Sequence, residues 1–113
     1  MRYYHNPRCS KSRQALALLH ERGIAPELVA YLDSPPSPQV LEALLGKLGI
    51  GARELLRKGE SEYAALGLAD PALEDSTLIA AMSAHPILIE RPIFEHGDRA
   101  VIGRPPERVL ELL

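Results

Sequence analysis

The pattern of apolar and polar positions divides the first third of the chain into a strand, a helix and a second strand. Residues 2–4 form a short strand candidate, and the Asn6-Pro7 pair that follows favours a turn. From residue 10 to residue 22 apolar side chains recur at helical spacing, and Gly23 ends the pattern. Residues 27–32 predict a second strand.

The middle third has the spacing of several helices. Ser37 is a suitable N-cap and Pro38 a suitable first residue for a helix that Gly49 ends. Shorter helical patterns follow at about residues 52–57, 60–66 and 76–84. We therefore expect a helical segment over about residues 37–85.

The last third returns to strands. Residues 87–89 form an apolar run that predicts a buried extended segment, and residues 92–94 and 100–102 flank a hairpin signal. Two prolines then lead into a last helix, whose expected inward-facing residues are Val109, Leu110 and Leu113. The order β-α-β, helices, β-β-α predicts an α/β fold with one small mixed β-sheet covered by helices.

Length and charge narrow the class of protein. The chain has 113 residues, the size of one domain, and a formal net charge of −2, so no general basic field is available to hold nucleic acid. No apolar stretch approaches the length of a membrane span, and the first residues do not have the pattern of a signal peptide. We therefore expect a cytoplasmic protein with no nucleic-acid or membrane partner. No large apolar stripe lacks a core role, which favours a monomer.

Cys9 is the only cysteine, and it directly precedes the first predicted helix. Its thiolate is the reactive form, but at the ordinary pKa of a thiol only about 3% is ionised at pH 7. A helix N-terminus stabilises an anion by at most about 2 kcal/mol, so other groups must contribute. The candidates close in sequence are the side chains of Arg8, Lys11, Arg13 and His5, and the Ser12 hydroxyl one helical turn away. The polar and basic neighbours disfavour the alternative of a small buried core cysteine.

The loop around Cys9 is the first of several motifs that resemble one family. Residues 5–13, His-Asn-Pro-Arg-Cys-Ser-Lys-Ser-Arg, match the pattern His-Asn-Pro-x-Cys-x-x-Ser-Arg of the glutathione/glutaredoxin-coupled arsenate reductases, the ArsC type of the thioredoxin-like superfamily. The resemblance continues in order over essentially the whole chain, through Tyr31-Leu32, Pro35-Pro36, Leu55-Leu56-Arg57-Lys58, Leu66-Gly67-Leu68, residues 85–92 and Gly103-Arg104-Pro105.

This resemblance implies a fold and a set of site residues. The fold is thioredoxin-like, with residues 1–113 as a single domain and the helical segment of about residues 37–85 as an insertion. Cys9 matches the nucleophile of the family. The other matches are the anion-binding arginines Arg57, Arg91 and Arg104, the thiolate-stabilising residues His5 and Ser12, and Pro92 as the candidate for a cis-proline beside the thiol.

The activity implied is the reduction of arsenate to arsenite, with glutathione as co-substrate, glutaredoxin as partner and no tightly bound cofactor. Arsenate is a tetrahedral oxyanion, and the planar fork of arginine suits two of its oxygens at once. Two alternatives stay open: an orphan glutathione-dependent thiol reductase, and a thioredoxin-fold protein that regulates transcription. Such regulators typically sense redox state through a CxxC pair, and Ser12 occupies its second position here.

The remaining charged residues carry no further site prediction. His20, His85 and His96 lack ligand-like spacing with the cysteine or with carboxylates, so we expect no metal site. Arg53, Arg99 and Arg108 are interpreted as surface charges.

Overall fold

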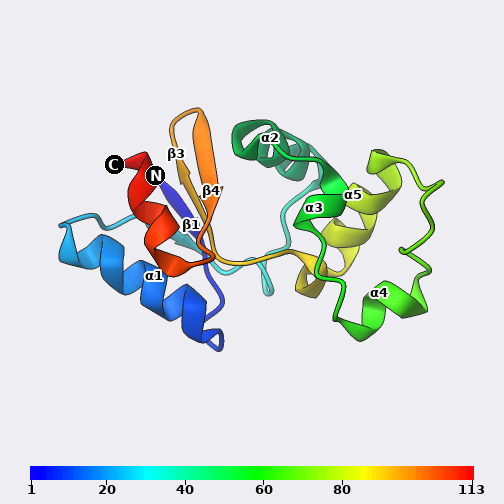
Figure 1. Cartoon of the computed structure of the whole chain (residues 1–113), viewed down its shortest axis with the longest axis horizontal. Coiled ribbons are helices and arrows are strands. Elements are labelled where there is room, and N and C mark those ends of the chain that lie inside the picture. The colour runs from blue at the N-terminus through cyan, green and yellow to red at the C-terminus, as the bar shows by residue number, and fades with distance from the viewer. The chain divides into compact units, whose positions relative to one another are not determined.

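A four-stranded sheet forms from the two ends of the chain in the computed structural model, which describes all residues from 1 to 113 (Figure 1). The strands are β1 (Arg2–Tyr4), β2 (Glu27–Val29), β3 (Ile93–His96) and β4 (Arg99–Ile102), in the spatial order β2-β1-β3-β4. β1 pairs in parallel with β2, whereas the β1–β3 and β3–β4 pairs are antiparallel. This arrangement confirms the predicted mixed sheet.

The chain forms two compact units. One contains Met1–Ser34 and Arg91–Leu113, and therefore the whole sheet, while the other contains Pro35–Glu90 and is helical. The helical unit is a little longer than the predicted insertion of about residues 37–85.

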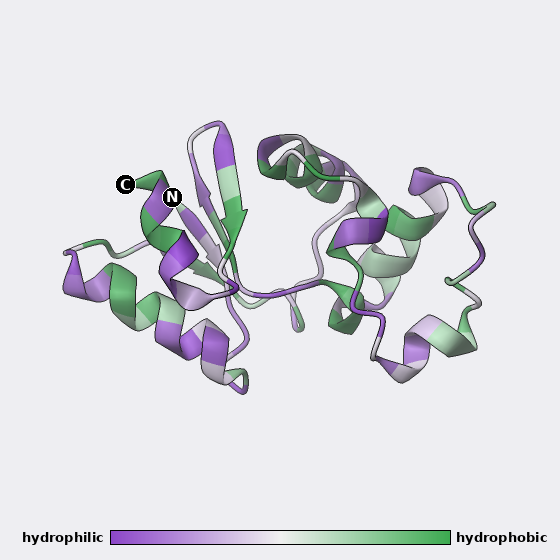
Figure 2. Cartoon of the chain, viewed as in Figure 1, coloured by the Kyte–Doolittle hydropathy of each residue, from purple (hydrophilic) through white to green (hydrophobic).

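Two helices complete the unit that contains the sheet. α1 (Ser10–Glu21) and the 3-10 helix η2 (Pro106–Leu112) pack against each other and share one hydrophobic core with the sheet. Figure 2 shows α1 as alternating hydrophobic and hydrophilic bands, the pattern of a helix with one buried face. The fully buried members of this core include Tyr3, Ala15, Leu19, Phe94 and Val109.

The last helix is tighter than the prediction assumed. Because η2 is a 3-10 helix, every third side chain lies on the same face. Pro106, Val109 and Leu112 are accordingly buried, and Leu110 packs partly against the core. Leu113, predicted to face inward from the spacing of an α-helix, is 49% exposed. That prediction was wrong.

The helical unit contains α2 (Pro38–Leu48), α3 (Ala52–Leu55), α4 (Ser61–Ala65), α5 (Asp75–Ala84) and the 3-10 turn η1 (Pro86–Leu88). The predicted ends of α2 are confirmed. The Ser37 hydroxyl accepts a hydrogen bond from the backbone N–H of Val40 at 3.2 Å, and Gly49 ends the helix with φ of 70°. Arg53, interpreted as a surface charge, is half-buried and donates to the carbonyl oxygens of Leu68 and Asp70.

Two predicted strands differ from the structure. β2 ends at Val29, three residues earlier than predicted, and the chain then turns. Residues 87–89 were expected to be extended, but Pro86 begins the 3-10 turn η1, and only Ile89 makes a β-bridge, with Leu56. Periodicity does not distinguish a short apolar run in a strand from one in a helical turn, which explains this error.

Gly103 provides a test of the packing that joins β4 to β3. A Cβ atom at Gly103 would lie 2.8 Å from Pro92 Cγ and 3.1 Å from Val109 Cγ1, both on buried residues. We expect Gly103→Ala to lower the free energy of unfolding by about 1–3 kcal/mol, the usual cost of overpacking, in urea denaturation followed by circular dichroism.

The matched control is Gly46→Ala. Gly46 lies inside α2, and a Cβ atom there would meet nothing within 4 Å. Alanine favours a helix over glycine by up to about 1 kcal/mol, so this variant should be as stable as the natural chain or more so. Equal stability of the Gly103 variant and the natural chain would contradict the close packing at Gly103.

Candidate functional site

Cys9 occupies the N-cap position of α1, at the end of the loop that follows β1. The thiol is free and 8% exposed, and its backbone has the extended conformation of an N-cap residue. The backbone N–H groups of Lys11 and Ser12, in the first turn of α1, provide hydrogen bonds to the sulfur. The sequence position therefore gives the thiol the predicted helix N-terminus.

The pKa of the Cys9 thiol is the balance of opposed effects. Burial raises it, because desolvation penalises the charged thiolate. The backbone hydrogen bond from Ser12, the charge and side-chain hydrogen bond of Arg91, and the backbone hydrogen bond from Lys11 lower it. The net result is a pKa below the ordinary value of a thiol. The site thus makes the thiolate easier to form than in a free cysteine, which is the change that a nucleophilic cysteine requires.

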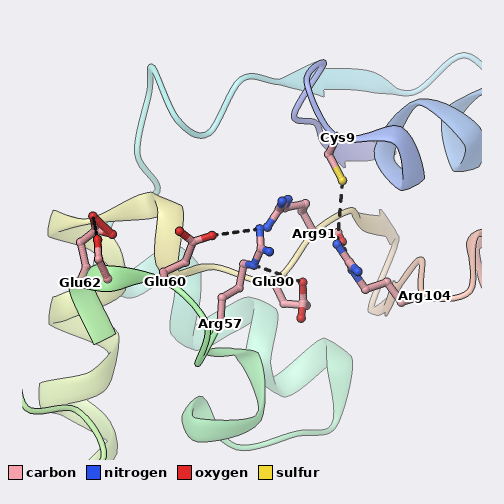
Figure 3. Close-up of polar contacts among 8 residues, drawn as sticks. Cys9, Arg57, Glu60, Glu62, Glu90, Arg91 and Arg104 are labelled. Carbon is pink, nitrogen blue, oxygen red and sulfur yellow. Dashed lines mark hydrogen bonds and ion pairs between the residues drawn. The ribbon is translucent and has the colours of Figure 1, made fainter. Parts of the chain in front are cut away.

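Two of the predicted arginines lie beside this sulfur, on the loops that precede β3 and follow β4, which meet at the open end of the hairpin. Arg104 Nη2 lies 3.9 Å from Cys9 Sγ, and Arg104 Nε donates to the Arg91 carbonyl oxygen at 2.7 Å (Figure 3). The Gly103 N–H donates to the Pro92 carbonyl oxygen at 2.9 Å, which ties the two loops together. The Arg91–Pro92 peptide bond is cis, the geometry that the family resemblance implies for Pro92, and the Arg104–Pro105 bond is also cis.

His5 and Ser12 interact with each other. Ser12 Oγ is fully buried, lies 2.7 Å from His5 Nδ1 and accepts a hydrogen bond from the Asn6 backbone N–H at 3.1 Å. The hydroxyl of Ser12 therefore braces the loop that precedes Cys9, and the backbone N–H of Ser12, not its hydroxyl, reaches the sulfur. Burial and the charge of Arg13 lower the pKa of His5, which disfavours a positive charge on this side chain.

Arg57, the third predicted arginine, belongs to the helical unit. It follows α3, and its guanidinium forms ion pairs with Glu60 and Glu90 at 3.5 and 3.8 Å (Figure 3). The structure thus brings Cys9, Arg91 and Arg104 together in the unit that contains the sheet. The His5–Ser12 pair contacts the loop that precedes Cys9. The proposed anion-binding role of all three arginines stays a prediction.

The sequence reasoning did not identify Arg91 as the main side chain that stabilises the thiolate. The four side chains close to Cys9 in sequence were expected to do this, whereas Arg91 arrives from the opposite end of the chain. The family motif that contains Arg91 and Pro92 was the available signal: it placed Arg91 in the site with Cys9 but did not single it out for the thiolate.

The structure shows no group of three histidine, cysteine, aspartate or glutamate side chains able to hold a metal ion. None of its helices combines the length and the apolar character that crossing a bilayer requires.

The contribution of Arg91 to the thiol can be measured directly. We expect Arg91→Ala to raise the pKa of Cys9, because the variant loses both a positive charge and a hydrogen bond at the sulfur. The measurement is the rate of alkylation by iodoacetamide as a function of pH. Arg99→Ala, which removes an exposed arginine from β4, is the control and should leave the profile in place. A profile equally unchanged in Arg91→Ala would contradict a contribution of Arg91 to the ionisation of Cys9.

Comparison with known proteins agrees with this geometry. The model of the ArsC family matches residues 4–112. The chain is 51% identical to the "Uncharacterized protein YfgD" of Escherichia coli, over 100% of this chain and 96% of that protein. It is 46% identical to an "Arsenate reductase" of Neisseria meningitidis, over 100% of this chain and 97% of that protein.

Among solved structures, the "Arsenate reductase from Vibrio cholerae" superposes with a TM-score of 0.96 at 49% identity, covering 100% of this chain and 98% of that one. Its likeness supports the thioredoxin-like fold, and the family match includes the Cys9 loop and both arginine loops beside the sulfur. The chain therefore belongs to the ArsC family.

Proposed function

We propose that this protein reduces arsenate to arsenite through the Cys9 thiolate, with glutathione and glutaredoxin as the source of electrons. The observation that carries the proposal is the single free cysteine at a helix N-terminus with Arg91 and Arg104 at its sulfur. The relatives named arsenate reductase match this chain along its full length, which supports the substrate.

The charges around the sulfur suit an oxyanion. Arsenate carries negative charge on oxygens arranged as in phosphate, and arginine donates two parallel hydrogen bonds to such a group. Two guanidinium groups beside one thiolate also reduce the repulsion between that thiolate and an incoming anion. Arg57 is proposed as a third donor to the oxyanion, on the strength of the family motif.

The first chemical step is attack by the thiolate on arsenic(V). A sulfur–arsenic bond forms, and one arsenate oxygen leaves as water after protonation. A glutathione thiolate then attacks the Cys9 sulfur, so that a sulfur–sulfur bond forms as the sulfur–arsenic bond breaks. The electron pair of the broken bond stays on arsenic, which leaves as arsenite, and the two sulfurs are oxidised to a mixed disulfide.

The second half of the cycle requires a thiol from another molecule. The chain has one cysteine, so no internal thiol is available to resolve the Cys9–glutathione disulfide. A glutaredoxin thiol attacks the glutathione sulfur and releases Cys9 as the thiolate. Because Cys9 is the only cysteine, the electrons must come from thiols of other molecules, for which we propose glutathione and glutaredoxin.

The proposal predicts arsenate-dependent oxidation of NADPH in a mixture of the protein, glutathione, glutaredoxin and glutathione reductase. The Cys9→Ser variant should reduce the rate to background, because a serine hydroxyl does not form the thiolate or the disulfide. The measurement is the loss of NADPH absorbance with time at several arsenate concentrations.

Two further arms make the result specific. Replacement of glutaredoxin and glutathione by thioredoxin and its reductase should abolish turnover, and full activity in that mixture would contradict the proposed donor. Reduction of a mixed disulfide with glutathione, at a rate independent of arsenate, would contradict arsenate as the substrate. That result would identify a glutathione-dependent thiol reductase.

A further inference from the structure

The guanidinium of Arg57 lies between two carboxylates in the helical unit. Arg57 Nη1 is 3.5 Å from Glu60 Oε1, and Arg57 Nε is 3.8 Å from Glu90 Oε1 (Figure 3). The three side chains are similarly shielded, with exposed fractions of 23%, 25% and 27%. Ion pairs at this depth are screened less than pairs on the open surface, so their charges affect what binds nearby.

Main-chain hydrogen bonds fix the backbone positions from which all three side chains extend. The Arg57 N–H donates to the Leu88 carbonyl at 2.8 Å, and the Glu90 N–H donates to the Leu55 carbonyl at 2.8 Å, on either side of the Leu56–Ile89 bridge. Glu60 is the N-cap of α4, and its backbone N–H donates to the Arg57 carbonyl oxygen at 3.4 Å. The carboxylates are therefore held at Arg57 by main-chain contacts as well as by charge.

Both carboxylates hold the same guanidinium that an incoming anion would need. An oxyanion that approaches Arg57 gains hydrogen bonds from the guanidinium but is repelled by Glu60 and Glu90. We propose that Glu60 and Glu90 are positioning residues that hold Arg57 in place without substrate and limit its affinity for oxyanions. This inference rests on the proposed function, which assigns Arg57 to the oxyanion.

Competition for Arg57 and a purely structural role predict opposite changes in anion affinity when the carboxylates are neutralised. If the carboxylates only supported the fold, their neutralisation would leave anion binding unchanged or weaken it. If they compete with the anion for Arg57, their neutralisation strengthens anion binding. Because the pairs are partly exposed, we expect a gain of about two- to fivefold in affinity from each variant.

The experiment is isothermal titration of the full chain with inorganic phosphate, repeated with arsenate. Glu60→Gln and Glu90→Gln should each bind phosphate more tightly than the natural protein, and Arg57→Ala should bind it more weakly. Circular dichroism and thermal unfolding establish that each variant is folded. Because Glu60 and Glu90 lie on different segments, either variant alone is sufficient for the test.

Glu62→Gln is the matched control. Glu62 is two residues from Glu60, in the first turn of α4, and its Oε1 accepts from the Ser61 hydroxyl at 3.2 Å rather than pairing with Arg57. The Glu62→Gln substitution removes one negative charge from the same region and leaves both ion pairs of Arg57 in place. Tightening of equal size in Glu62→Gln would overturn the inference, since a general charge effect would explain it. Unchanged or weaker binding in the folded Glu60 and Glu90 variants would also overturn it.

The outcomes separate this inference from the proposed function. Phosphate binding needs no electron donor, so tightening that is lost in the Arg57→Ala/Glu60→Gln double variant supports the inference even where arsenate is not reduced. Arsenate turnover through Cys9, with phosphate affinity unaffected by Arg57→Ala, would overturn the inference and leave the proposed function standing.

Discussion

A thiol that is almost fully buried ionises only if hydrogen-bond donors and positive charge replace the hydration that it loses. Cys9 meets this constraint with backbone N–H groups at the start of α1 and with Arg91. Neither source is sufficient by position alone: the helix N-terminus stabilises an anion by at most about 2 kcal/mol, and an exposed arginine would be screened by water. In the unit that contains the sheet, the start of α1 and the loop before β3 bring these donors to one sulfur.

The fold achieves this with short, firmly tied connections. β1 leads into the Cys9 loop, and the Tyr3 hydroxyl donates to the Ser12 carbonyl in the first turn of α1. The β3–β4 hairpin brings its two flanking loops together, and the hydrogen bond from Arg104 Nε to the Arg91 carbonyl links them. The close approach of Gly103 to Pro92 allows this junction, since a larger residue would separate the loops.

The sequence was sufficient for most of the local structure because those features depend on neighbours in the chain. The caps of α2, the stop at Gly23 and the hairpin are set by Ser37, by glycine at positive φ and by turn chemistry. Residues 87–89 and the last helix were misjudged because apolar spacing over a few residues fits more than one helix or strand geometry. Arg53 was misjudged because its contacts with Leu68 and Asp70 are 15 and 17 residues away and leave no periodic pattern.

The same distinction holds for the site. The helix position of Cys9 is local and could be predicted, whereas the stabilisation of its sulfur by Arg91 depends on the sheet topology. Even for His5, a near neighbour of Cys9, the lowering of its pKa by burial and by the charge of Arg13 became visible only in the structure. Motif resemblance singled out Cys9, Arg91 and Arg104, which the structure brings together, but the contact that each makes at the sulfur required the geometry.

The donors that ionise Cys9 also affect its behaviour as a leaving group. A thiol of lowered pKa is intrinsically a weaker nucleophile, but its sulfur leaves a disulfide faster. In the proposed cycle, an external thiol that attacks the mixed disulfide is therefore directed to the glutathione sulfur, because Cys9 departs as the better-stabilised thiolate. Since the chain has no second cysteine to compete for that step, the charges around Cys9 bias the direction of exchange. Arg91 and the first turn of α1 thus raise the fraction of thiolate available for the proposed attack, and they favour the return of Cys9 as the free thiolate.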